Sequence, residues 1–248
     1  MKHITSRKND VVTRYRRLGA DSLLRKSQGL YLCYGIKLLE EALRSGADIV
    51  SVLADHELSL PPLPQSAEVV TAPVDVVDSV APGQNSQGVL FLIRMPKSLG
   101  FPPSKGRFFL LDRLQDPGNV GSILRTAEAF ALSGVYLIDC CDPFSPKTAR
   151  AGMGALFRVP VGFCRADDLA QLALPVYAAN ISPDSRPVGQ IDFADCVVAL
   201  GNEGSGLSSE ILSLANAGLE IPMPGQAESL GVAAAAAVIG YHMRQEVM

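Results

Sequence analysis

Short apolar runs alternate with amphipathic segments along most of the chain. The runs of strand length lie at 29–35, 48–54, 67–72, 87–93, 107–112, 135–139, 175–180, 196–200 and 219–223. Apolar residues at helical spacing predict helices at 9–27, 36–46, 73–83, 119–134 and in the alanine-rich C-terminal segment. Strands that alternate with helices in this way favour an α/β fold with a mostly parallel sheet that is covered on both faces.

A break in this alternation divides the chain into two predicted domains. Residues 1–95 form one alternating unit, and residues 107–248 restart the pattern with an apolar strand. The segment 96–106 between them is rich in Pro, Gly and Lys, a composition typical of a linker. Ligands of parallel α/β sheets bind at the carboxyl ends of the strands. The candidate positions for chemistry therefore follow Asp112, Asn180, Leu200 and Met223.

The composition excludes several classes of protein. Of the 248 residues, 48% are hydrophobic and 19% are charged, which is ordinary for a folded globular chain. No apolar run approaches the ~20 residues of a membrane-spanning helix, and no signal-peptide core is present, so we expect a cytoplasmic protein. The five cysteines form no Cys-x-x-Cys pair and the three histidines form no His-Glu-x-x-His motif. We therefore expect neither a metal site nor a disulfide framework.

The charge is distributed unevenly along the chain. A net charge of -3 argues against a general nucleic-acid binder, yet the first 26 residues hold eight of the basic residues and only two acidic ones. A basic arm on an acidic body can follow a phosphate backbone, although the same pattern also fits a solvated helix face. The candidate phosphate-binding residues of this arm are Arg7, Lys8, Arg14, Arg17, Arg25 and Lys26.

The stretch LDRLQDPGNVGSILRTAEAF begins in the strand at 107–112. Its Asp-Pro-Gly sequence predicts a turn, and Asn119 is placed to cap the helix that follows. Asn119, Ser122 and Arg125 recur at i, i+3 and i+6, so an amide and a guanidinium can face one ligand. For these residues taken alone, a helix cap and a solvated arginine are the simpler explanation.

A glycine-rich stretch, GNEGSG, follows the strand at 196–200. Glycines allow backbone N–H groups to approach a ligand closely, and the start of a helix behind them favours anions. Ser209 stands where a dinucleotide fingerprint has its third glycine, and the lysine of a P-loop is missing. Asn202 and Glu203 inside the turn are difficult to explain by structure alone, so they are candidates for chemistry.

The third stretch, IPMPGQAESLGVAAAAAVIG, leads into the C-terminal helix. Ser229 is placed to cap this helix. The alanines at 233–237 have high helix propensity and favour a close helix–helix contact, within the chain or across a dimer.

Together, DPGNVGSILRTAEAF, LGNEGSGLSSEI and IPMPGQAESL resemble in order and spacing the motifs of the SpoU (TrmH-like) RNA 2'-O-ribose methyltransferases of the SPOUT superfamily. The resemblance extends to ITSRKNDVV and GIKLLEEAL, which look like the family's N-terminal RNA substrate-binding domain, an L30e-like fold. It implies that residues 107–248 form an α/β knot, a methyltransferase domain whose C-terminal segment passes through a loop. It also implies that residues 1–95 bind RNA, so the basic arm would contact RNA.

The resemblance further implies a cofactor, partners and residue roles. The cofactor would be S-adenosylmethionine, the substrate a ribose 2'-hydroxyl of ribosomal RNA or else tRNA, and the assembly a homodimer without metal. The residues that match the family's cofactor-binding positions are Gly201, Ile221 and Leu230, with Ala178 and Asn180 as weaker additions. Those that match its catalytic positions are Asn119, Arg125, Glu203 and Ser229.

Two positions depart from the family pattern. Gly231 stands where the family has an asparagine, and Tyr34 stands where it has a glutamate. Two other interpretations therefore stay open: an RNA-binding protein of the same fold with weak or no methyltransferase activity, and a small-molecule α/β enzyme that uses another nucleotide. The latter explains none of the three motifs. The presence of all four residues that match catalytic positions favours an active enzyme.

Overall fold

Two compact units make up the chain in the computed structural model, which describes residues 2–81, 86–182 and 184–244. The first unit comprises residues 1–96 and 142–157, and the second comprises residues 97–141 and 158–248. The excursion 142–157 thus belongs to the first unit although it lies within the second half of the sequence. No helix among the described residues is long and apolar enough to cross a membrane.

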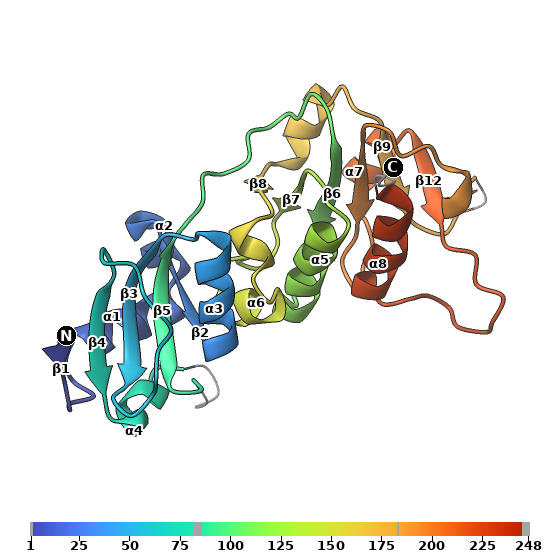
Figure 1. Ribbon diagram of the computed structural model, residues 1–248. Coiled ribbons are helices and arrows are strands. Elements are labelled where there is room, and N and C mark those ends of the chain that lie inside the picture. The colour runs from blue at the N-terminus through green and yellow to red at the C-terminus, as the bar shows by residue number, and fades with distance from the viewer. Residues whose placement is uncertain (1, 82–85, 183, 245–248) are drawn as a thin grey trace. The chain divides into compact units, whose positions relative to one another are not determined.

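A five-stranded mixed sheet forms the centre of the first unit (Figure 1). Its order is β1-β4-β3-β5-β2, and its strands are β1 (Lys2–His3), β2 (Leu30–Tyr34), β3 (Ile49–Asp55), β4 (Glu68–Ala72) and β5 (Val89–Arg94). Strand β5 pairs antiparallel with both β2 and β3, whereas β1, β4 and β3 run parallel. The helices of the unit are α1 (Asp10–Ala20), α2 (Ser22–Gln28), α3 (Ile36–Ser45), α4 (Val74–Asp78) and α6 (Pro146–Ala151).

The single helix predicted at 9–27 is in fact two helices. Asp21 ends α1 in an extended conformation, and its carboxylate accepts hydrogen bonds from the backbone N–H groups of Leu23 and Leu24 at the start of α2. A side chain that caps a helix competes with continuation of the preceding one, so the chain turns here. The helix predicted at 73–83 is limited to Val74–Asp78, and residues 82 and 83 lie outside the described part of the chain.

A buried arginine holds the excursion onto the first unit. The side chain of Arg25 is 4% exposed, and its Nε and Nη2 donate to the Asp142 carboxylate at 2.9 and 2.6 Å. The same guanidinium donates to the carbonyls of Leu18 and Gly19 at the end of α1. All of these bonds lie inside the unit, so Arg25 is no longer a candidate RNA-contacting residue.

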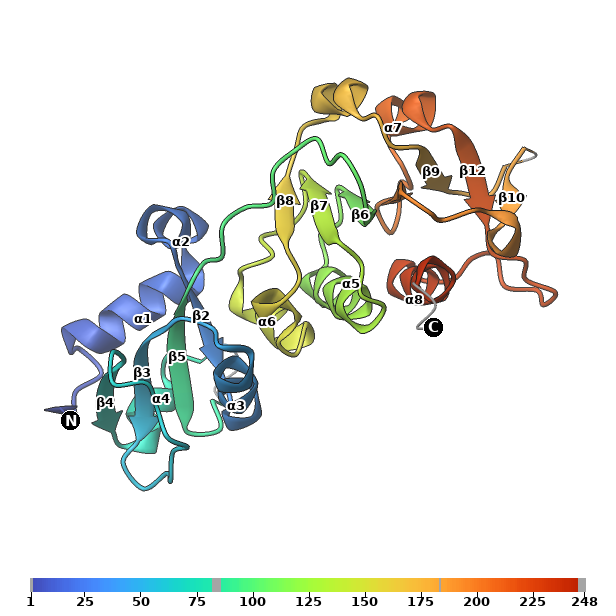
Figure 2. The same ribbon diagram turned by 45° about the horizontal axis from the view of Figure 1, so that its top comes forward.

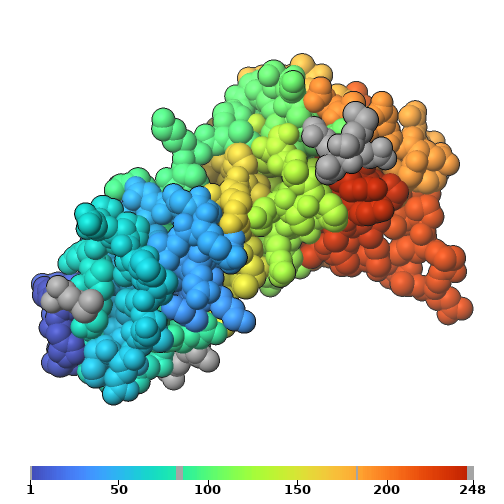
Figure 3. Space-filling view, viewed as in Figure 1, coloured from blue at the N-terminus to red at the C-terminus, as the bar shows by residue number. Residues whose placement is uncertain are grey.

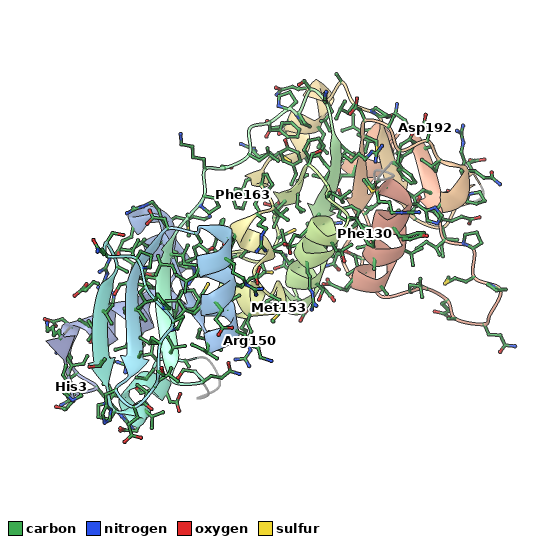
Figure 4. The ribbon with its side chains drawn as sticks, in the orientation of Figure 1. His3, Phe130, Arg150, Met153, Phe163 and Asp192 are labelled. Atoms are coloured by element: carbon green, nitrogen blue, oxygen red, sulfur yellow. The ribbon has the colours of Figure 1, made fainter. Side chains whose placement is uncertain are left out.

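Tyr34, which replaces the glutamate of the family pattern, contacts the same excursion. The guanidinium of Arg150, at the end of α6, lies 4.8 Å from the centre of the Tyr34 ring (Figure 4). An aromatic face attracts a cation through its quadrupole, so the ring partners the arginine without a carboxylate. Nearby, the rings of Tyr31 and Phe144 lie 5.3 Å apart. Arg150 therefore has a partner at position 34, although the acidic residue of the family pattern is absent.

The second unit is built on a seven-stranded sheet of order β10-β12-β9-β11-β6-β7-β8 (Figure 2). Its strands are β6 (Arg107–Asp112), β7 (Gly134–Ile138), β8 (Val161–Phe163), β9 (Val176–Ala179), β10 (Arg186–Pro187), β11 (Cys196–Leu200) and β12 (Ala217–Glu220). Every pair of neighbouring strands in it is parallel, which confirms the predicted parallel sheet. Strand β12 ends before Ile221, earlier than the apolar run at 219–223 predicts.

Helices cover both faces of this sheet because successive strand residues point to opposite sides. Phe108 and Leu110 pack with Ile211 of α7 (Ser209–Leu214) on one face. On the other face, α5 (Pro117–Ala129) and α8 (Val232–Met243) lie side by side (Figures 1 and 2). A Cβ added at Gly240 would lie 2.9 Å from Phe130 and 3.0 Å from Thr126, so this glycine allows α8 to approach α5 closely.

We predict that Arg25→Met destabilises the first unit by about 3–5 kcal/mol, because Asp142 is left largely buried without its partner. Methionine keeps the apolar stem and removes only the guanidinium. Denaturant unfolding followed by circular dichroism measures the change. Arg7→Met is the matched control: its pair with Asp75 has an N–O distance of 2.8 Å but is exposed on both sides, so a loss below about 1 kcal/mol is expected. Equal losses in the two variants would contradict this account.

Candidate active site

The carboxyl ends of β6 and β11 lie next to each other in the middle of the second unit's sheet. The two strands are parallel neighbours, and Leu200 at the end of β11 is in register with Leu111 of β6. The segments that follow them, which begin at Arg113 and Gly201, therefore start side by side. This pairing brings the first two sequence motifs together.

The glycine-rich segment after β11 folds back on itself into a compact loop, residues 201–208, which we call the β11 loop. Asn202 and Gly206 exchange two backbone hydrogen bonds of 3.0 Å. The side-chain oxygen of Asn202 accepts from the backbone N–H groups of Gly204 and Ser205 at 2.9 and 3.0 Å. A Cβ added at Gly201 would lie 2.4 Å from the backbone of Gly206 and of Leu207, so no other residue fits there without moving the loop.

Helix α5 begins two residues earlier than the sequence predicts. Asp116 is its N-cap, and the Asp116 carboxylate accepts from the backbone N–H of Asn119 at 2.8 Å, while Pro117 occupies the first helical position. The prediction that Asn119 caps the helix is therefore wrong. Because Asn119 lies inside the first turn, its side-chain amide is free to act elsewhere.

The amide of Asn119 contacts Glu203 of the β11 loop. Its Nδ2 donates to Glu203 Oε1 at 2.9 Å across 84 positions of sequence, and Asn202 Nδ2 donates to Glu203 Oε2 at 3.3 Å. Both oxygens of the carboxylate are thus held by amides. Two of the predicted catalytic residues, Asn119 and Glu203, are in direct contact.

These contacts keep Glu203 ionised. Partial burial by itself would raise the pKa of the Glu203 carboxyl, but the hydrogen bond from Asn119 and bonds with backbone groups outweigh it, so the pKa lies below its ordinary value of 4.5. The stability that the ionised carboxylate contributes is therefore present above that ordinary value and is lost as the pH falls through the lowered pKa. At neutral pH the site carries a fixed negative charge.

Arg125 lies on α5, six residues after Asn119, with an exposed side chain. Within the described ranges of the chain, no residue forms a hydrogen bond or an ion pair with it. A guanidinium stays protonated at any relevant pH and offers five N–H donors in a plane. It is therefore available for an anionic ligand.

A cavity of about 120 Å³ opens at the carboxyl ends of β9 and β12. Four of the predicted residues line it, namely Asn180, Ile221, Ser229 and Leu230. The remaining lining residues are Ala179, Ile181, Leu219, Glu220, Met223, Ala235 and Ile239. Apolar walls with a single amide, a hydroxyl and a carboxylate suit a ligand with flat apolar faces and polar edges, such as a nucleoside.

The other two predicted cofactor-binding residues, Ala178 and Gly201, do not line this cavity. Ala178 is 1% exposed within β9 and is in register with Ala199 of β11. Gly201 follows the end of β11. Since β12, β9, β11 and β6 are consecutive parallel neighbours, the cavity, the β11 loop and the start of α5 occupy adjacent positions along one edge of the sheet.

The sequence did not identify part of the cavity wall. Ala235 and Ile239 line it from α8, one helical turn apart. The alanine run had been assigned to helix packing only, and nothing in its composition distinguishes an alanine in a helix contact from one in a cavity wall. Met223 and Ile181 could have been found, because each lies within two residues of a predicted contact.

The segment between β12 and α8 projects from the second unit (Figure 3). Ser229 in this segment is exposed, and Leu230 is 38% exposed. The predicted cap at Ser229 is wrong: Gly231 is the N-cap of α8, and no side chain caps the helix. The Ser229 hydroxyl is therefore available to the cavity. A Cβ added at Gly231 would meet nothing within 4 Å, so this position has room for a larger residue.

Three of the cysteines that are candidates for chemistry by residue type are Cys140, Cys164 and Cys196. Burial raises the pKa of Cys140, Cys164 and Cys196 to about 12, so they stay protonated at neutral pH. Across the described ranges, no group of three His, Cys, Asp or Glu side chains could hold a metal ion.

The second half of the chain matches a known protein family. The model of the SpoU rRNA Methylase family matches residues 106–241, more than half of the chain. A relative from Bacillus subtilis (strain 168), 23S rRNA (guanosine(2553)-2'-O)-methyltransferase RlmP, is 32% identical over 98% of this chain and 100% of its own length. The 23S rRNA (uridine(2479)-2'-O)-methyltransferase of Streptomyces viridochromogenes is 28% identical over 99% of this chain and 93% of its own.

A solved structure shows the same fold over both units. The AdoMet-bound rRNA methyltransferase from Sinorhizobium meliloti aligns with a TM-score of 0.84 and 28% identity. The alignment covers 100% of this chain and 98% of that chain. The arrangement of strands and loops described above is therefore one that an AdoMet-binding protein adopts.

We predict that Asn119→Ala raises the pKa of Glu203 towards its ordinary value, because the hydrogen bond that favours the ionised form is removed. A titration of glutamate side chains labelled with carbon-13 and followed by NMR measures this change. Glu210 is the internal control: its pKa is lowered by its own backbone N–H and by Ser209, so it should not respond. An unchanged Glu203 titration in the variant would contradict the assigned contact.

Proposed function

Because the chain belongs to the SpoU rRNA methylase family, we propose that the cavity, the β11 loop and the start of α5 form one active site. The protein is an S-adenosylmethionine-dependent methyltransferase that acts on a ribose 2'-hydroxyl of ribosomal RNA. The observation that carries the site assignment is the 2.9 Å hydrogen bond between Asn119 and Glu203. It joins two motifs that are remote in sequence at the sheet edge where the cavity opens.

The lining of the cavity fits this cofactor. Ile221, Leu230 and Ile239 offer apolar contacts to the faces of a purine, while Asn180 and Ser229 offer polar groups to its edge or to a ribose. We propose that the β11 loop holds the rest of the cofactor through backbone groups, since Gly201 leaves no room for a side chain between them. When bound, the cofactor supplies a methyl group that is activated on a positively charged sulfur.

We assign Arg125 to the RNA rather than to the cofactor. A guanidinium stays protonated in proteins and therefore does not accept the proton of the 2'-hydroxyl. It can bind the phosphate next to the target ribose with two parallel hydrogen bonds and stabilise the oxygen as negative charge develops on it. The exposed position and the lack of a partner among the described residues support this role.

Asn119 and Glu203 orient the reacting groups. Methyl transfer requires the 2'-oxygen to lie in line with the bond that breaks. Side chains that are held rigidly lower the barrier, because less entropy is lost when the reacting groups are aligned. Glu203 holds Asn119 in one rotamer, and Asn119 in turn holds the carboxylate in its ionised form. We propose that Ser229, whose hydroxyl reaches the same cavity, orients the ribose from the opposite side.

The RNA would extend over the basic face of the first unit. Arg14 and Arg17 lie on the exposed face of α1, opposite the buried Val12, Tyr15 and Leu18. Lys8 and Lys26 are exposed as well. Arg7 is exposed but pairs with Asp75 at 2.8 Å, so a phosphate would have to replace this carboxylate. We propose these five residues as sequence-independent backbone contacts.

Four further features are proposed from the family. The chain forms a homodimer, for which the exposed Tyr241 and Leu230 offer apolar surface on and beside α8. Its second unit is knotted, its first unit is L30e-like, and the protein works in the cytoplasm. Strand β12 lies near one end of the strand order, and after it the chain returns to pack α8 against α5. This path is compatible with a C-terminal segment that passes through a loop.

We predict that Arg125→Lys reduces methyl transfer by about 100-fold or more with little change in cofactor affinity, because lysine keeps the charge but not the planar fork. Single-turnover transfer of a labelled methyl group to ribosomal RNA measures the rate, and calorimetry measures cofactor binding. Arg150→Lys, which changes an arginine of the first unit at the Tyr34 ring, is the control and should transfer normally. Near-normal transfer by Arg125→Lys would remove this residue from the mechanism.

The proposed function is tested by mapping 2'-O-methylated nucleotides in RNA from cells with and without the gene. We predict the loss of methylation at a ribosomal position, restored by the wild-type protein. Gly231→Asn should fold, because the position is open, and should transfer at least as fast as the wild type. Identical maps with and without the gene would overturn the methyltransferase assignment.

A further inference from the structure

The side chain of Asp112 is a buried carboxylate that the mechanism above does not use. It is the last residue of β6 and is 1% exposed. In the described part of the chain it is the only acidic residue that is buried. A carboxylate is stable in such a place only when hydrogen bonds and an opposite charge replace the water that it loses.

One of its partners belongs to the β11 loop. Asp112 Oδ2 accepts from the backbone N–H of Ser208 at 2.7 Å, across 96 positions of sequence. The other oxygen, Oδ1, accepts from Arg113 Nε at 3.1 Å. The loop thus supplies one of the hydrogen bonds on which the buried charge depends, so this end of the loop is tied to the end of β6.

The neighbouring residue ties the other end of the loop. Arg113 adopts a left-handed backbone with φ 57°, which is uncommon for a residue with a side chain. Its carbonyl accepts from Asn202 Nδ2 at 2.8 Å and from Gln115 Nε2 at 3.2 Å. A strained backbone of this kind persists where its surroundings determine it. Asp112 and Arg113 therefore hold the β11 loop near its first and last residues.

Gly201 and Glu203 flank Asn202, the first of these two attachment points. A loop of eight residues could adopt many conformations, and ordering it on cofactor binding would reduce affinity. Two fixed points remove most of that freedom before the cofactor arrives. The backbone groups beside Gly201 are then already in place.

We propose that Asp112 is a positioning residue that sets cofactor affinity by holding the β11 loop in one conformation. It touches neither cofactor nor RNA and acts through Ser208 and Arg113. The inference rests on the proposed function, because the loop binds a cofactor only in a methyltransferase. Asparagine does not replace this carboxylate, since its amide has one acceptor whereas Ser208 and Arg113 both donate.

The experiment measures the affinity of the full-length protein for S-adenosylmethionine by calorimetry. We expect Asp112→Asn to raise the Kd about tenfold or more, since a hydrogen bond to a charged group is lost. The KM for the cofactor should rise in parallel, while the KM for RNA should stay within about twofold. A Kd within about twofold of wild type in a folded variant would overturn the inference.

A second variant removes the same hydrogen bond from the loop side. Ser208 has φ −67°, which proline can adopt, and its side chain makes no cap hydrogen bond to α7. Ser208→Pro therefore deletes the N–H donor and leaves Asp112 intact, and it should raise the Kd as Asp112→Asn does. Two changes to one contact are not additive, so the double variant should bind no more weakly than the weaker single variant. Additive losses would contradict the shared role.

The matched control is Tyr136→Phe, which removes a 2.6 Å hydrogen bond to the Gly100 carbonyl from a buried side chain of β7. It should lower the melting temperature without changing the Kd. If the control raises the Kd as much as Asp112→Asn does, loss of stability alone explains the effect and the inference fails. If the wild-type protein binds no S-adenosylmethionine, the proposed function fails instead.

Discussion

Parallel pairing of β6 with β11 is the constraint on which the site depends. The five registered residue pairs between these strands place two loops next to each other that are about 90 residues apart in sequence. Asn119 reaches Glu203, and Asp112 reaches Ser208, only because both strands end at the same edge. A slip of one residue in this register would turn the side chains of the slipped strand to the opposite face and displace the loop that follows it. The chemistry of the second unit therefore follows from its sheet topology.

Arg25 and Asp112, the two buried charged residues in the described part of the chain, have a similar structural effect in different places. Arg25 holds residues 142–157 on the first unit, and Asp112 holds the β11 loop on the second unit's sheet. Each of these charged side chains is stable out of water only when all of its hydrogen-bond and ion-pair partners are in position. Such groups add little net stability, but they penalise every arrangement in which a partner is displaced. They select one conformation for the segments that they anchor.

The two departures from the family pattern have different physical meanings. At position 34 the ring of a tyrosine partners Arg150, so the contact is made by other means. At position 231 the glycine leaves open space at the start of α8, and no described residue lies within 4 Å of a Cβ built there. The tyrosine at position 34 thus has an identified partner, Arg150. The second departure leaves room for a larger side chain next to Ser229 and Leu230.

Most of the strands and helices and the parallel sheet of the second unit follow from the sequence, because apolar periodicity is a local property of the chain. The short strands β1, β8 and β10 lie outside the predicted runs. The three motifs likewise indicated Asn119 and Glu203 before any contact between them was known. The caps at Asn119 and Ser229 were predicted wrongly, since Asp116 and Gly231 compete for the same roles and only backbone geometry decides between them. Burial of Arg25 depends on Asp142, 117 residues away, and the left-handed Arg113 depends on Asn202. Contacts of this range exist only once the strands have paired, so tertiary structure alone decided which charges are buried and which are free to bind.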